Sequence, residues 1–180
     1  MKIVKRETVF KGKFLKVTAK HFENDEGKKG VWECVEKKKK AVIIFALTKQ
    51  KEVILAKTYR FPVEGYVLEL PAGLCDKQGE TEKQTAKREL REETGYEAKE
   101  IFPIFKTTGD MSLTDMDLIY FFAPDIEFKG KTATDDAEDI EVVKVPVDKL
   151  VDTALNPPKG LKICFTLLSS VPVLRSKGLI

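Results

Sequence analysis

Hydrophobic and polar positions alternate along the first part of the chain. Residues 15–35 alternate well enough to predict two strands, joined by the polar, glycine-rich turn at residues 24–30. The apolar segment at residues 41–47 is short and rich in β-branched residues, which favours a buried strand over a helix. Residues 52–59 and 66–70 continue the strand pattern. We therefore predict an N-terminal hairpin followed by three core strands.

One helix is predicted with defined ends, over residues 82–93. Thr81 followed by Gln84 forms a capping-box motif at its start, and Gly95 is the residue type that commonly ends a helix. The expected helix therefore begins and ends on signals that are local in the sequence.

The second half of the chain mixes strands, loops and helices. The segments between the predicted elements at residues 107–116 and 125–139 are long enough to line a functional site. Strands are predicted at residues 101–106, 117–123 and 140–145, and helices at residues 147–155 and 159–168. The fold class is therefore mixed α and β, in the α+β sense.

Composition narrows the possible partners and compartments. The 180 residues suit one domain with a small appendage, and 32 basic against 29 acidic residues leave a net charge of +3. This balance does not suit a nucleic-acid binder, and the longest apolar run, residues 41–47, is too short for a signal peptide or a membrane span. The three cysteines are far apart and odd in number, which disfavours a disulfide framework. We expect a cytoplasmic protein with no nucleic-acid or membrane partner.

Three carboxylates share one face of the predicted helix. At about 100° per residue, Glu89, Glu92 and Glu93 fall within about 100° of one another. Glu89 and Glu93 are like charges spaced i, i+4, which is unfavourable unless a cation or a shifted protonation compensates. Oxygen ligands without histidine or cysteine indicate Mg²⁺ or Mn²⁺ rather than zinc. Taken alone, these spacings favour a solvated acidic face.

A longer motif around this helix favours the metal site over a solvated acidic face. Glu80-x7-Arg88-Glu89-Leu90-x-Glu92-Glu93-x-Gly95-Tyr96, preceded by Pro71-Ala72-Gly73, resembles the Nudix box, G-x5-E-x7-R-E-U-x-E-E-x-G-U, where U is apolar. Six residues rather than five separate Gly73 from Glu80, so we expect a bulged loop and an intact helix. The resemblance implies the Nudix fold, an α/β/α sandwich with a mixed sheet and an N-terminal β-hairpin subdomain. We predict a hairpin and dimerisation subdomain over residues 1–40 and a hydrolase domain over residues 41–180.

The same resemblance implies roles for the box residues. Glu89, Glu93 and the Ala72 carbonyl would bind Mg²⁺, with Mn²⁺ as the alternative, and Glu92 would be an additional ligand. Arg88 would pair with a box glutamate, Glu80, and hold the loop against the helix.

Segments outside the box resemble ADP-ribose and ADP-sugar pyrophosphatases. They are residues 31–35, 58–62 and 65–74. The resemblance implies that Trp32 stacks on adenine, the alternative being a core or interface tryptophan, and that Arg60 contacts phosphate.

Three further residues receive roles from this resemblance. Glu69 would contact ribose or else face solvent, and Gly73 would lie at the substrate. The general base is expected in the acidic loop, with Glu138 as the candidate and Asp136 or Asp139 as alternatives.

The predicted activity is Mg²⁺-dependent hydrolysis of ADP-ribose or a related nucleoside diphosphate sugar by a homodimer, giving AMP and a sugar phosphate. The family's usual proline after the box is replaced, since Thr108 precedes Gly109. A hydrolase of nucleoside triphosphates or dinucleoside polyphosphates is therefore an alternative. A non-catalytic module that binds ADP-ribose is a second alternative, which the complete set of box carboxylates disfavours.

Overall fold

The computed structural model describes residues 1–36, 39–130 and 139–180, and the chain within them divides into two compact units. The N-terminal unit comprises Met1–Lys40 and Lys106–Leu118, and the core unit comprises Ala41–Phe105 and Ile119–Ile180. The segment Lys106–Leu118 thus groups with the N-terminal residues, although it lies in the middle of the sequence.

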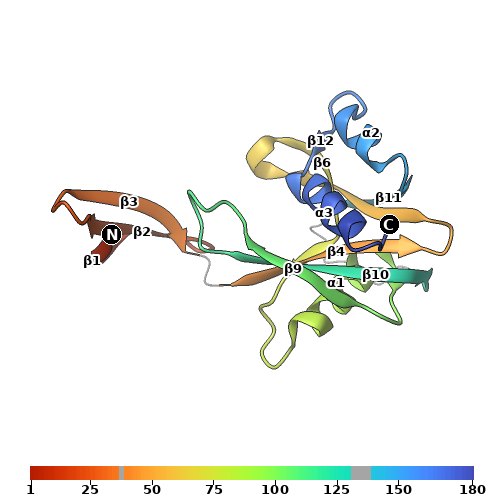
Figure 1. Ribbon diagram of the computed structural model, residues 1–180, viewed down its shortest axis with the longest axis horizontal. Coiled ribbons are helices and arrows are strands. Elements are labelled where there is room, and N and C mark those ends of the chain that lie inside the picture. The colour runs from red at the N-terminus through yellow and green to blue at the C-terminus, as the bar shows by residue number, and fades with distance from the viewer. Residues whose placement is uncertain (37–38, 131–138) are drawn as a thin grey trace. The chain divides into compact units, whose positions relative to one another are not determined.

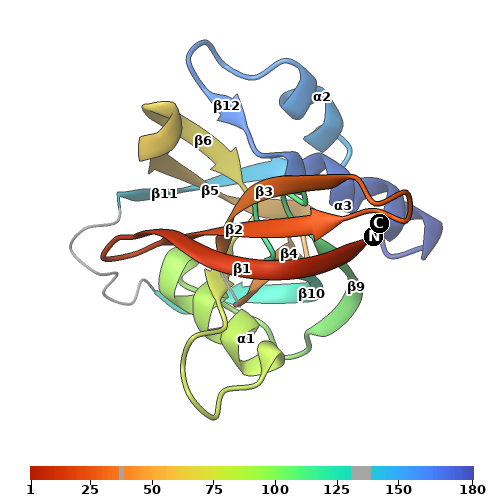
Figure 2. The same cartoon turned by 90° about the vertical axis from the view of Figure 1, so that its left-hand side faces the viewer.

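The N-terminal unit contains a three-stranded antiparallel sheet in the order β1-β2-β3 (Figure 2). Its strands are β1 (Lys2–Lys11), β2 (Lys16–Glu23) and β3 (Lys29–Glu36). The predicted hairpin is confirmed as β2 and β3, with the Asn24 side chain accepting backbone hydrogen bonds inside the turn. Strand β1 was not expected, and every one of its residues is exposed.

The core unit is built around a mixed sheet in the order β12-β6-β5-β4-β10-β8. Figure 1 labels β12, β6, β4 and β10 of this sheet. Strand β11 also pairs with β5, β7 with β4, and β9 with β10. The sheet is mixed because β12 runs parallel to β6 while β6 and β11 run antiparallel to β5. The strands are β4 (Lys40–Thr48), β5 (Glu52–Arg60), β6 (Gly65–Glu69), β7 (Ala72–Leu74), β8 (Tyr96–Glu97), β9 (Phe102–Thr108), β10 (Asp117–Phe128), β11 (Ile140–Pro146) and β12 (Lys162–Ile163).

Both faces of this sheet are covered by helices. Even-numbered residues of β4, such as Ile44, share one buried cluster with Leu90 of α1 (Glu82–Thr94). On the other face, the Tyr120 hydroxyl lies 3.0 Å from Ser169 Oγ of α3 (Phe165–Ser176), and Phe45 contacts Phe122. Strand β4 is buried on both sides, which is why its sequence is a continuous apolar run. The predicted α/β/α sandwich is confirmed.

The C-terminal helices differ from the prediction. Helix α2 spans Leu150–Leu155, within the expected range, but α3 begins at Phe165 rather than at residue 159. Gly160 adopts a left-handed conformation with φ of 84°, and β12 then pairs with Val67 and Leu68 of β6. A left-handed turn and a strand pairing therefore occupy the first part of the expected helix, and its last residues, 165–168, are helical. None of the helices in the described residues combines the length and apolar character needed to cross a bilayer.

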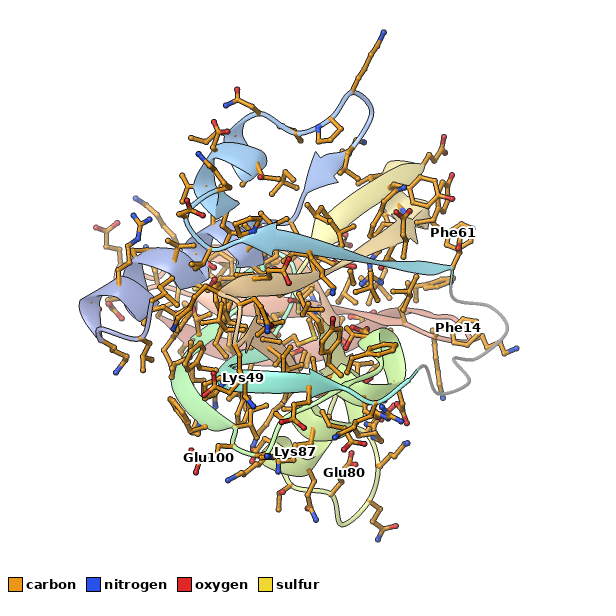
Figure 3. All side chains as sticks on the ribbon, turned by 90° about the vertical axis from the view of Figure 1, so that its right-hand side faces the viewer. Phe14, Lys49, Phe61, Glu80, Lys87 and Glu100 are labelled. Atoms are coloured by element: carbon orange, nitrogen blue, oxygen red, sulfur yellow. The ribbon has the colours of Figure 1, made fainter. Side chains whose placement is uncertain are left out.

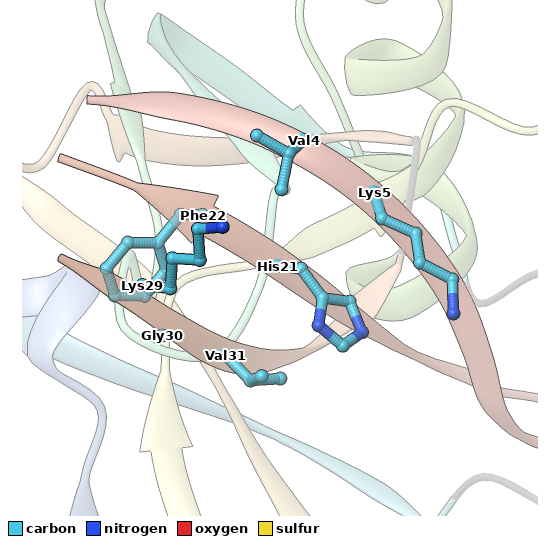
Figure 4. A pocket seen from close by; sticks show the side chains of 7 residues that line it. All are labelled: Val4, Lys5, His21, Phe22, Lys29, Gly30 and Val31. Carbon is cyan, nitrogen blue, oxygen red and sulfur yellow. The ribbon is translucent and has the colours of Figure 1, made fainter. Parts of the chain in front are cut away.

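A pocket of about 350 Å³ opens on the N-terminal sheet (Figure 4). Two basic side chains in its lining contact one carboxylate, since Lys5 Nζ and His21 Nε2 lie 2.6 and 3.6 Å from Glu7 Oε2. The lining consists of Val4, Lys5, His21, Phe22, Lys29, Gly30 and Val31, all of which belong to the N-terminal unit. The pocket therefore contains no residue of the box motif.

Candidate active site

The helix that carries the box carboxylates is positioned by its two ends. Thr81 Oγ1 accepts a hydrogen bond from the Gln84 backbone N–H, and the Gln84 side chain accepts one from the Thr81 N–H. At the other end Gly95 has φ of 75° and donates to the Arg91 carbonyl. Both predicted end signals are confirmed. The apolar side of the helix, including Leu90, is buried against the sheet, and the carboxylates lie beside it.

Arg88 connects two parts of the box. Its Nε and Nη2 each donate to a different carboxylate oxygen of Glu80 at 3.0 Å, which is the two-pronged geometry that guanidinium and carboxylate groups favour. Its Nη1 lies 2.7 Å from Glu92 Oε2 and 2.8 Å from Glu89 Oε1. The expected pairing with Glu80 is confirmed, and Figure 3 places Glu80 in the loop that leads into α1. One cation thus holds three box carboxylates.

Glu89 and Glu80 have opposite shifts in pKa. Burial raises the pKa of the Glu89 carboxyl, and Arg88 offsets part of that rise. The hydrogen bond from Arg88 lowers the pKa of Glu80, although burial opposes it. Of these two box carboxylates, Glu89 is therefore the one whose charge the protein compensates less well, which suits a group that meets a further cation.

Gly73 is required because Glu89 lies against its backbone. A Cβ atom at position 73 would come within 2.0 Å of Glu89 Cδ, so a side chain there would displace the carboxylate. Next to it, the Ala72 N–H donates to Glu93 Oε2 at 3.1 Å. The strand that precedes the box loop therefore fixes two of the carboxylates on α1.

The box loop adds a further cation beside this face. Lys77 Nζ lies 3.7 Å from Glu92 Oε1, and both side chains are about half exposed. The expected extra residue in this loop leaves the helix intact, and Gly79 turns the chain with φ of 81°. Sequence reasoning did not identify Lys77, because its approach to Glu92 depends on how the loop folds back.

The side chains at this site are of the type that binds a divalent cation through oxygen atoms. Glu89, Glu92 and Glu93 offer carboxylate oxygens beside the Ala72–Gly73 backbone, and the cradle at Gly73 leaves room for a carboxylate but not for a Cβ. In the described residues, no three histidine, cysteine, aspartate or glutamate side chains are grouped as metal ligands. In this conformation the Arg88 guanidinium contacts two of the three carboxylates.

Arg60 and Glu69 form a second charged pair in the core unit. Arg60 Nε and Nη2 donate to Glu69 Oε1 at 2.9 and 2.6 Å. Glu69 is buried, so the alternative that it faces solvent is wrong, whereas the Arg60 side chain is about half exposed. Arg60 therefore retains donors for an anionic ligand.

Aromatic side chains lie close to this pair, where β5 and β6 form an antiparallel hairpin. Tyr59 makes edge contacts with Phe61 and Tyr66, and Figure 3 shows Phe61 at the end of the hairpin, in the short 3-10 turn Phe61–Val63. The Tyr66 hydroxyl donates to Asp139 Oδ2 at 3.0 Å. Asp139, an alternative general base, is therefore held at the start of β11. Glu138, the preferred candidate, lies outside the described residues, as does Asp136.

Trp32 belongs to the N-terminal unit. The residue is 55% exposed, and its Nε1 donates to the Ser112 carbonyl at 2.8 Å. The core alternative for Trp32 therefore does not apply. The contact with Ser112 was not predicted, because no local pattern links residues so far apart in the sequence.

Helix α1 is capped, carries the carboxylates and is joined to its loop by Arg88, and it packs in an α/β/α sandwich. These features define the class of protein as a Nudix hydrolase. Residues 37–162 match the NUDIX domain, and the chain belongs to this family.

Individual relatives extend the match. The chain is 33% identical over 156 residues to the ADP-ribose pyrophosphatase of Bacillus subtilis (strain 168), covering 84% of this chain and 83% of that protein. It is 29% identical over 149 residues to the methanol dehydrogenase activator of Bacillus methanolicus, covering 82% and 80%. A crystal structure of an ADP compounds hydrolase superposes with a TM-score of 0.83 at 24% identity, covering 99% and 96%, which shows the shared fold.

Proposed function

We propose that this Nudix hydrolase cleaves the pyrophosphate bond of ADP-ribose or a related nucleoside diphosphate sugar, giving AMP and a sugar phosphate. The observation that carries the proposal is the carboxylate face of α1, where Arg88 bridges Glu80, Glu89 and Glu92 and Ala72 contacts Glu93. The similarity to proteins named ADP-ribose pyrophosphatase supports this choice of substrate.

In this proposal the box holds Mg²⁺, or Mn²⁺, through Glu89, Glu92, Glu93 and the Ala72 carbonyl. When bound, the metal supplies positive charge at the pyrophosphate and makes water a stronger acid. Arg88 keeps its two hydrogen bonds to Glu80 and so holds the loop and the helix together.

Other residues would bind the substrate and move the proton. Arg60 contacts phosphate through the donors that Glu69 leaves available, Glu69 contacts ribose, and Gly73, against which the Glu89 carboxylate lies, is at the substrate. Glu138 takes the proton from the attacking water, and Trp32 stacks on adenine. The water oxygen forms a bond to one phosphorus as the bond between that phosphorus and the bridging oxygen breaks. The bridging oxygen leaves with the other phosphate, so that each product carries one phosphate.

The test compares the wild-type protein with Glu93→Gln in the presence of ADP-ribose and Mg²⁺, with AMP measured by chromatography. We expect AMP formation to fall at least 100-fold in the variant, because one metal-binding charge is lost. Glu100→Gln, which removes an exposed carboxylate outside the box, is the matched control and should retain activity. Equal rates for wild type and Glu93→Gln would exclude this metal assignment.

The preferred substrate must be determined by comparing several nucleotides, because Thr108 stands where the family usually has proline. ADP-ribose, an ADP-hexose, ATP and a diadenosine polyphosphate should be compared at equal concentration by kcat/KM. We expect the nucleoside diphosphate sugars to give the largest values. A preference for ATP or the dinucleotide would move the assignment to the alternative substrate class.

We also propose a cytoplasmic homodimer. The three cysteines are far apart in the sequence and odd in number, which suits a reducing compartment. The N-terminal sheet exposes apolar side chains, among them Val4, Val9, Phe10 and Val31, in the pattern of a surface that another molecule covers. Sedimentation at micromolar concentration should give twice the 20.4 kDa chain mass. A value near one chain mass would exclude the dimer.

A further inference from the structure

Trp32 has only one polar side-chain atom, and the protein already uses it. The indole Nε1 is a donor without acceptor capacity, and it donates to the Ser112 carbonyl at 2.8 Å. More than half of the residue is nevertheless exposed. What remains available to a ligand is therefore the flat apolar ring, without a hydrogen-bonding edge.

The Ser112 carbonyl is held in place by Asp110. Asp110 Oδ1 accepts hydrogen bonds from both the Ser112 N–H and the Ser112 hydroxyl. The Asp110 carbonyl accepts from the N–H groups of Leu113 and Thr114, at 3.1 and 2.7 Å. The backbone bonds close a tight turn, and the Asp110 carboxylate adds the two bonds that hold Ser112 within it. The bond from the Ser112 hydroxyl lowers the pKa of Asp110, which keeps it ionised.

The turn is also attached to the strand that carries Trp32. The Val35 N–H donates to the Leu113 carbonyl at 2.8 Å, and Val35 forms a parallel bridge with Thr114. At the base of the loop, the Gly109 N–H donates to the Met116 carbonyl at 3.1 Å. Strand β3 and the turn thus hold the indole from two directions, and all of these residues lie in the N-terminal unit.

From this arrangement we propose that Asp110 is a positioning residue for nucleotide binding, which fixes the Trp32 ring as a stacking surface by ordering the turn that accepts its N–H. The inference rests on the proposed function, in which Trp32 stacks on the base. Because every base presents a flat π-face, this surface gives affinity for a nucleotide but little selection among bases.

The experiment uses Trp32 as its own reporter, since it is the only tryptophan in the chain. AMP is titrated into the full-length protein with Mg²⁺ while tryptophan emission is followed, and Kd is measured independently by calorimetry. We expect AMP and GMP to quench the emission with Kd values within about 3-fold of each other, because stacking tolerates any base. Ribose 5-phosphate should leave the emission unchanged.

Asp110→Ala tests the positioning role. We expect the Kd for AMP to rise about 5-fold or more, since base stacking on an aromatic side chain contributes a factor of this size or larger. The Kd for ribose 5-phosphate should stay within 2-fold, and KM for ADP-ribose should rise while kcat is kept. Acrylamide quenching of the free protein should increase, because the ring loses its fixed partner. Asp110→Asn, which keeps an oxygen acceptor, should restore most of the affinity, and Asp148→Ala controls for loss of an exposed aspartate.

Two results would overturn the inference. If AMP fails to bind, or binds without changing Trp32 emission, the stacking surface is wrong. If Asp110→Ala binds AMP as tightly as wild type, the positioning role is wrong. Both results can occur in a protein that still forms AMP from ADP-ribose, so they are distinguishable from failure of the proposed function, in which no AMP forms.

Discussion

The core unit and the N-terminal unit bury their apolar side chains in different ways. In the core unit, β4 is buried along Ala41–Thr48 because helices cover both faces of the sheet. In the N-terminal unit, β1 is exposed throughout. Among the residues that the structure describes in this three-stranded sheet, those that are buried are Thr18, Ala19 and Cys34. The core unit is therefore stabilised by layer packing, whereas the N-terminal sheet depends on strand pairing and contacts between neighbouring strands.

The largest expected effect comes from removing packing beneath the carboxylate helix. Leu90→Ala leaves a cavity in the buried cluster and should lower the free energy of unfolding by about 2–5 kcal/mol. Urea denaturation measures the change. Lys2→Ala, on the exposed strand β1, is the control and should change stability by less than about 0.5 kcal/mol. Equal losses in the two variants would mean that the units do not differ as described.

Arg88→Gln should have the next largest effect, measured without added metal. Glu80, Glu89 and Glu92 would lose their shared cation while remaining partly buried, which should destabilise the protein by about 1–3 kcal/mol. Adding Mg²⁺ should recover part of the loss, because a ligand of the native state stabilises it. Lys83→Gln, an exposed change on the same helix, should leave the melting temperature unchanged. An unaltered melting temperature in Arg88→Gln would contradict the role assigned to the guanidinium.

Within the N-terminal sheet, Phe22→Ala tests whether cross-strand contacts carry stability. The Phe22 ring lies over Gly30, where a Cβ atom would come within 2.5 Å of the ring, and the two residues are opposite one another on β2 and β3. Losing this contact should cost about 1 kcal/mol. Protease cleavage within residues 1–36 should become faster. Phe14→Ala, an exposed aromatic residue, provides the comparison and should have no measurable effect.

The smallest expected effect is a pH dependence from Glu80. Arg88 lowers its pKa below the ordinary value of 4.5, so the unfolded chain binds the proton more tightly than the native state. The stabilisation is present above about pH 4.5 and is lost as the pH falls through the lower native pKa. Melting temperatures between pH 6 and pH 3 should therefore fall less steeply in Glu80→Gln than in wild type. Glu26→Gln, in the exposed β2–β3 turn, should keep the wild-type slope.

The parts of the fold that could be predicted are those with local signals. The ends of α1 depend on Thr81, Gln84 and Gly95, all adjacent to the helix, and the apolar run of β4 reflects burial on both faces. Strand β1 escaped prediction because neither of its faces is buried, so no hydrophobic period marks it. Strand β12 escaped because two residues pair with β6, far away in the sequence.

The residues of the candidate site also fall into those with a local sequence signal and those without one. Glu89, Glu92 and Glu93 follow from helical spacing and the box motif, and the Arg88–Glu80 pair follows from the same motif. Lys77 and Asp110 could not be found in this manner. Their contacts with Glu92 and Ser112 arise from the paths of loops, which hydrophobic periodicity does not describe.

The two-sided burial of β4 restricts where this chain can change length. Side chains alternate across a strand, so adding or deleting one residue within β4 would exchange the layer against α1 with the layer against α3 and disrupt both at once. A connecting loop has no such alternation to preserve. The additional residue between Gly73 and Glu80 lies in a loop of this kind, and it is accommodated there without shifting any carboxylate of α1 to another side of the helix.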